Sequence, residues 1–73
     1  MQNSNSEPQN SVNQINSAIS KITDAKTKPC LEQARNQANA FIQAAYDNEE
    51  ISLSQKYTFS KKVRSAYRSQ LGA

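Results

Sequence analysis

The side chains best placed to do chemistry are a group of cations in the last third of the chain. Tyr57, Lys61, Arg64 and Arg68 are spaced i, i+4, i+7 and i+11, so they form one continuous ridge if this segment is an α-helix. Such a ridge can hold anionic groups while the tyrosine stacks or hydrogen-bonds nearby. We therefore take these four residues as candidate partner-binding residues, with Lys62 as a peripheral contact. The alternative is a solvated face whose cations favour the C-terminal end of the helix dipole.

The distribution of charge also indicates an anionic partner. Residues 1–50 hold four Lys or Arg against six Asp or Glu, whereas residues 51–73 hold five Lys or Arg and no acid. An acidic protein surface is the favoured partner, and nucleic acid (DNA) is the alternative, because phosphates attract the same cations. The net charge of +3 is modest for a committed DNA-binding domain. A helix-turn-helix is only weakly indicated, because the predicted turn at 48–51 lacks glycine.

No pattern of catalytic or metal-ligating residues is present. Cys30 is the only cysteine and there is no histidine, so neither a Cys–His nucleophile nor a zinc site can form. The acidic group at Asp47, Glu49 and Glu50 lacks the spacing of a calcium loop and instead suits the N-terminus of a following helix. The single glycine excludes a phosphate-cradling loop. We expect no enzyme activity, no catalytic residue, no cofactor and no metal.

The helix predicted most clearly spans residues 29–47 and is expected to lie at the centre of the fold. Its polar residues gather on one side and its apolar residues recur at i, i+3, i+4 and i+7. The apolar stripe consists of Leu31, Ala34, Ala38, Phe41, Ile42, Ala45 and Tyr46. Because three of its members are alanine, a neighbouring helix can approach closely.

A first helix is predicted over residues 11–26. Ser11 and Gln14 form a capping-box pattern at its start. Its apolar stripe is Val12, Ile15, Ile19 and Ile22. This stripe is interpreted as a bundle face, and the less common alternative is a homodimer formed through the same four residues.

Pro29 cannot continue the first helix, so Thr27 or Lys28 should cap the second helix.

A third helix is predicted over residues 52–71. Ser52 and Gln55 repeat the capping-box pattern, and Gly72 should end the third helix. Its apolar side is predicted to be Leu53, Tyr57, Phe59, Val63, Ala66, Tyr67 and Leu71.

Together these elements predict one all-α domain, a three-helix bundle over residues 11–73 behind a disordered tail at 1–10. No apolar run is long enough for a membrane span. The lone cysteine and the lack of a secretory signal favour a cytoplasmic location. In style the chain is similar to small Asn- and Ser-rich accessory proteins of phages and mobile elements, although no motif carries the likeness. The resulting hypothesis is a non-enzymatic module that docks on another protein, as an inhibitor or an adaptor.

Overall fold

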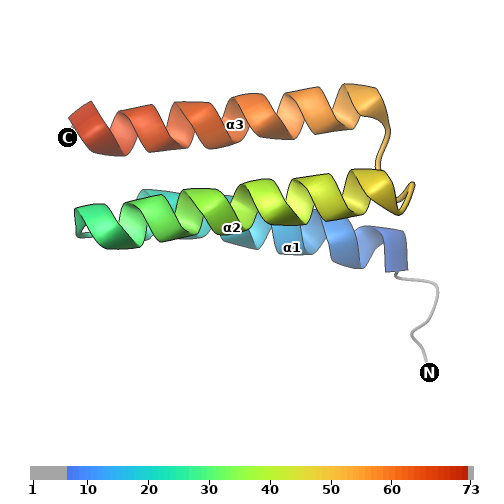
Figure 1. Cartoon of the computed structure of the whole chain (residues 1–73), viewed down its shortest axis with the longest axis horizontal. Helices are drawn as coiled ribbons and strands as arrows, with labels where there is room; N and C mark the ends of the chain where they lie inside the picture. The colour runs from blue at the N-terminus through green and yellow to red at the C-terminus, as the bar shows by residue number, and fades with distance from the viewer. Residues whose placement is uncertain (1–6, 73) are drawn as a thin grey trace.

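A computed structural model describes residues 7–72 of the chain, with side chains from residue 11 onward. It contains three helices: α1 (Glu7–Asp24), α2 (Lys28–Asp47) and α3 (Leu53–Gly72). They run side by side along the long axis of the molecule, joined by two short turns (Figure 1). In this described part of the chain helix is the only regular structure, and the predicted all-α three-helix bundle is confirmed.

The start of α1 differs from the prediction. The helix begins at Glu7 instead of Ser11 and ends at Asp24 instead of Lys26. Residues 7–10, assigned by sequence to a disordered tail, form its first turn, where Pro8 is tolerated because a first-turn N–H needs no helical partner. Residues 1–6 lie outside the described part. Ser11 is therefore inside the helix and does not cap it; its hydroxyl donates a hydrogen bond to the carboxylate of Glu50.

The turn between α1 and α2 follows the predicted capping pattern. Thr27 has an extended backbone, and its hydroxyl accepts a hydrogen bond from the backbone N–H of Cys30 at 3.3 Å. Pro29 lies in the first turn of α2. The end of α3 reaches back to this turn, because the side-chain amide of Gln70 donates to the carbonyl of Ala25 at 3.0 Å.

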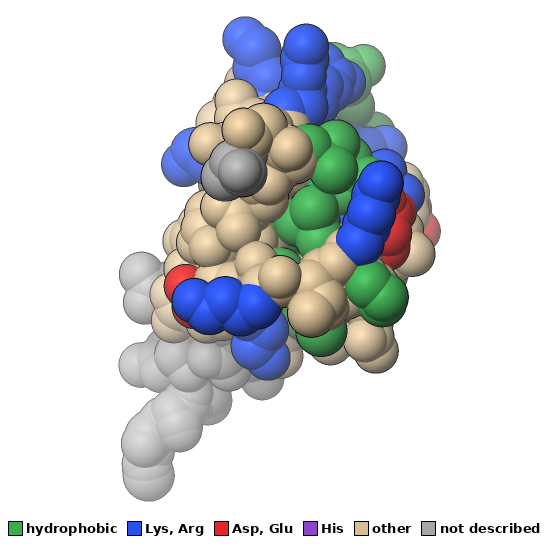
Figure 2. Space-filling model, turned by 90° about the vertical axis from the view of Figure 1, so that its left-hand side faces the viewer, with side chains coloured by type: hydrophobic (Ala, Val, Ile, Leu, Met, Phe, Trp, Pro, Cys, Tyr) green, Lys and Arg blue, Asp and Glu red, His purple; other side chains and the backbone are tan. Residues whose placement is uncertain are grey.

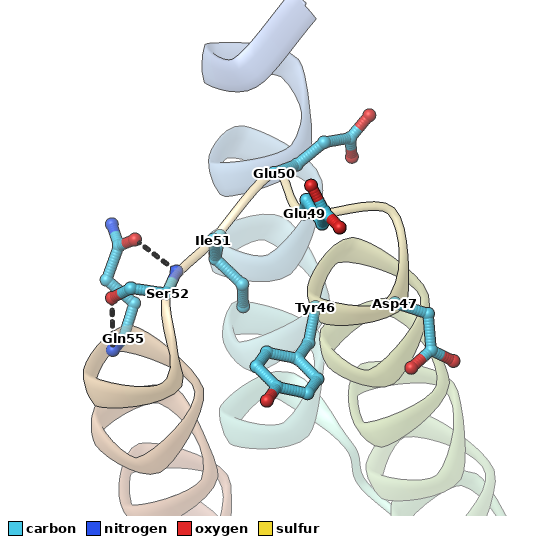
Figure 3. A pocket seen from close by; sticks show the side chains of 7 residues that line it. All are labelled: Tyr46, Asp47, Glu49, Glu50, Ile51, Ser52 and Gln55. Carbon is cyan, nitrogen blue, oxygen red and sulfur yellow. Dashed lines mark hydrogen bonds between the residues drawn. The ribbon is translucent and has the colours of Figure 1, made fainter.

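The turn between α2 and α3 holds two capping motifs. The predicted capping box is confirmed: the Ser52 N–H donates to Gln55 Oε1 at 2.8 Å, and the Gln55 N–H donates to Ser52 Oγ at 3.1 Å (Figure 3). The C-terminus of α2 closes with an unpredicted motif in which Glu49 adopts a positive φ of 62°. These motifs fix the reversal that lays α3 against α2.

The core is formed by twelve buried apolar side chains from all three helices and from Ile51 in the second turn. Five of the seven predicted stripe residues of α2 are buried, and Phe41 and Tyr46 pack at the margin. Ile15 and Ile22 of α1 have no exposed surface at all. Two of the four side chains named for the homodimer alternative are therefore already buried within the chain, and Val12 and Ile19 pack partly buried beside them.

The apolar side of α3 is narrower than predicted. Phe59, Val63 and Ala66 are buried and Tyr67 is partly buried. Three other predicted members remain 46%, 64% and 49% exposed, namely Leu53, Tyr57 and Leu71. In a three-helix bundle each helix buries only the arc that its two neighbours cover, so the outer margin of a broad stripe stays in solvent. No helix in the described residues is long and apolar enough to cross a bilayer.

Candidate partner-binding surface

The outer face of α3 carries the predicted basic ridge. Lys61, Arg64 and Arg68 are exposed, and Tyr57 is the most exposed of the large hydrophobic side chains among the described residues. At 100° per residue, the mean direction of the ridge is roughly 160° from that of the buried Phe59–Val63–Ala66 face, and the ridge is about 16 Å long. Viewed from the end of the bundle, Lys and Arg side chains gather over α3 (Figure 2). Periodicity alone therefore placed these four residues correctly on one face.

Lys62 does not lie on this ridge. Its Nζ atom lies 5.8 Å from the centre of the Phe59 ring, at the edge of the core-facing side of α3. By helical geometry it points roughly 130° away from the centre of the ridge. The structure thus brings together four of the five predicted residues and separates the fifth.

Two reciprocal cation–π contacts, which no sequence pattern predicted, cross the seam between α2 and α3. The Nζ atom of Lys56 on α3 lies 4.6 Å from the ring centre of Tyr46 on α2. The guanidinium carbon of Arg35 on α2 lies 4.5 Å from the ring centre of Tyr67 on α3. Each helix thus supplies one cation and one tyrosine, and the two contacts hold the antiparallel helices in register.

The Arg35–Tyr67 contact is extended by Glu32. Arg35 Nη2 lies 2.7 Å from Glu32 Oε1, in the one ion pair among the described side chains. The Tyr67 hydroxyl donates a hydrogen bond to the other carboxylate oxygen, Oε2. This hydrogen bond, partial burial and the negative charge of Glu32 raise the pKa of Tyr67, and the nearby Arg35 opposes the rise. The result is a fixed, partly exposed polar cluster on the seam.

A groove of about 260 Å³ opens beside this cluster. It is lined by side chains from both helices, with Val63 of the core among its walls: Arg35, Asn39, Ser60, Val63, Arg64 and Tyr67. Arg64 belongs both to this groove and to the ridge. Two guanidinium groups, an amide and a hydroxyl therefore border one concave surface. Such donors can bind a carboxylate or a phosphate oxygen.

The opposite charge lies at the turn between α2 and α3. Asp47, Glu49 and Glu50 are exposed there, around a shallow hollow that also includes Ile51 (Figure 3). Residues 36–55 contain these three acids and no cation. The turn is therefore acidic, whereas α3 is basic.

Among the described residues no three Asp, Glu, Cys or His side chains are grouped to hold a metal ion.

Comparisons with protein families, with curated proteins and with solved structures found no match to this chain.

Proposed function

We propose that the protein is a non-enzymatic binding module that docks through the outer face of α3 onto an acidic surface of another protein. The observation that carries this proposal is the ridge of Tyr57, Lys61, Arg64 and Arg68 on the side of α3 opposite the core. The single ion pair among the described side chains does not involve any of them. A partner can therefore bind this face without disturbing the bundle.

The composition of the face supports a protein partner. Tyrosine and arginine dominate the energetics of protein interfaces, and each of them can contribute both apolar area and hydrogen bonds. Leu53 and Leu71, about half exposed at the two ends of α3, add apolar contact area beyond the cations. A purely electrostatic site for a phosphate backbone would not need them. The module would act as an inhibitor or adaptor, and the single cysteine fits a cytoplasmic setting.

The first prediction is that reversing two ridge charges abolishes docking. In a pull-down from nuclease-treated extract of the source cells, the wild-type chain should retain a protein partner, and Lys61→Glu/Arg64→Glu should lose it. Circular dichroism should show unchanged helicity, because both side chains are exposed. The matched control is Lys21→Glu/Gln33→Glu/Gln37→Glu, which makes the same change of −4 in net charge at exposed positions on the α1–α2 side of the bundle.

Two results would contradict this proposal. Equal retention of the partner by the ridge variant and by its control would show that the ridge is not the docking surface. Retention that disappears on nuclease treatment, together with a salt-sensitive mobility shift on mixed-sequence DNA, would instead establish the alternative of nucleic-acid binding by the same helix.

A further inference from the structure

The groove between α2 and α3 joins the basic ridge through a single shared residue. Arg64 lies on the ridge, and it also lines the groove together with Ser60, one turn earlier on the same flank of α3. A partner seated on the ridge therefore lies directly beside the groove. Any side chain that the partner extends past Arg64 enters a space bordered by a second guanidinium group, that of Arg35.

The guanidinium of Arg35 is held in place before any partner arrives. It is stacked on the Tyr67 ring at 4.5 Å and paired with Glu32 at 2.7 Å, yet its side chain remains 36% exposed. Glu32 contacts it through Nη2, and a guanidinium has five N–H donors in a fixed fork. Some N–H groups of Arg35 are thus free to donate to a ligand, and the side chain loses little conformational freedom when they do so.

The charge of the groove selects among anions. Arg35 and Arg64 contribute two positive charges and the adjacent Glu32 contributes one negative charge, which leaves a net charge of +1. A carboxylate carries one negative charge and matches this value. A phosphate group carries close to two negative charges at neutral pH, so it would leave a net charge of −1 in the groove once a partner covers it, and uncompensated charge shielded from water is costly. Asn39 and Ser60 add neutral donors on the same wall.

We infer that the groove is a receptor for an acidic side chain of the partner, whose carboxylate binds between Arg35 and Arg64 while the partner covers the ridge. This inference rests on the proposed function, and it names the chemical group that is recognised there. Asn39 and Ser60 donate to the remaining lone pairs of the carboxylate. The groove thus supplies specificity for a projecting Glu or Asp, beyond the general attraction of the ridge for negative charge.

The second prediction uses a capped hexaglutamate peptide as the probe and the ¹⁵N-labelled full chain as the receptor. Titration followed by NMR should shift the guanidinium N–H signals of Arg35 and Arg64 in a saturable way. Asn39→Leu removes the amide donor while keeping a side chain of nearly the same shape and the same net charge, and it should weaken binding about tenfold, the effect expected for loss of a hydrogen bond to a charged group. Asn36→Leu is the matched control on the outer side of α2 and should bind as the wild type does.

The alternative results separate this inference from the proposed function. Shifts confined to Lys61 and Arg68, or equal binding by the two leucine variants, would contradict carboxylate binding in the groove and leave docking on the ridge intact. Saturation of the Arg35 and Arg64 signals by inorganic phosphate at lower concentration than by hexaglutamate would overturn the choice of a carboxylate. Absence of any saturable shift would also contradict carboxylate binding in the groove. The pull-down would then test docking through the ridge independently.

Discussion

At the scale of single residues, Glu32 links two helices through one carboxylate. It pairs with Arg35 three residues later on α2 and accepts a hydrogen bond from Tyr67 on α3. The cation of Arg35 lies over the same tyrosine ring. The three side chains therefore depend on one another, because moving any one of them weakens two contacts.

The third prediction concerns the pH dependence of stability. The Tyr67 hydroxyl must keep its proton to donate the hydrogen bond to Glu32, and a deprotonated Tyr67 would also place its negative charge against that carboxylate, so the pKa of Tyr67 in the folded protein lies above the ordinary value of 10.0. Folding then favours the protonated hydroxyl. Its contribution to the free energy of unfolding is fully present below pH 10 and is lost as pH rises through the higher folded pKa.

Urea unfolding of wild-type and Tyr67→Phe proteins at several pH values checks this sign. The stability advantage of the wild type should be constant up to about pH 9 and should shrink above pH 10. Tyr57→Phe is the control, because that ring is 64% exposed and has no hydrogen bond among those found in the described residues. An advantage that grows with rising pH would contradict the assigned direction of the shift.

At the scale of elements, the helix ends show which local signals can be recognised in sequence. Thr27 and the Ser52–Gln55 box were predicted because a cap is made within three or four residues of the chain. The predicted start of α1 at Ser11 was wrong. The Asn- and Ser-rich composition of this segment indicates disorder, and Glu7-Pro8 is its only signal for a helix start. Ser11 fitted the capping pattern yet lies inside the helix, where its partner is Glu50, 39 residues away.

The end of α2 carries the fourth prediction. The Glu50 N–H donates to the Ala45 carbonyl at 2.8 Å and the Glu49 N–H donates to the Tyr46 carbonyl at 3.0 Å, which is the Schellman pattern. Glu49 occupies its left-handed position, at φ 62°, where an L side chain costs about 1–2 kcal/mol. Glycine adopts this geometry freely but loses more entropy on folding.

We therefore expect Glu49→Gly to raise the free energy of unfolding by about 0.5–1 kcal/mol, or a few degrees in Tm. Glu49→Ala removes the same carboxylate but keeps the Cβ atom, so it should give no comparable gain. Thermal unfolding of the two variants separates the backbone effect from the charge effect. Equal Tm values for the glycine and alanine variants would show that the positive φ is not a source of strain.

At the scale of the whole molecule, the bundle was predictable and the seam was not. Helical periodicity identified the buried stripe of α2 and the ridge of α3, since both depend only on spacing along one helix. The exposure of Leu53 and Leu71 depends on how far α1 and α2 cover α3. The pairs Tyr46–Lys56 and Arg35–Tyr67, and the groove beside them, require the register between two helices. The register between two helices cannot be inferred from the periodicity of residues within either one.

The last prediction tests whether α1 is held by the shared core. Ile22 has no exposed surface, whereas Ile19 on the same helix is only partly buried. The outward side of α1 contains weak helix formers such as Asn16 and Thr23, so most of its stability must come from packing. Ile22→Ala should lower the free energy of unfolding by about 2–5 kcal/mol.

At about 4–8 °C per kcal/mol for a domain of this size, the melting temperature of Ile22→Ala should fall by about 10 °C or more. Ile19→Ala removes the same atoms and makes the same change in helix propensity, so it is the matched control and should lose much less. Circular dichroism at 222 nm measures both. Because the core is shared by all three helices, the loss should appear as one cooperative transition at lower temperature. Equal losses in the two variants would mean that propensity, and not burial among the three helices, sets the stability of α1.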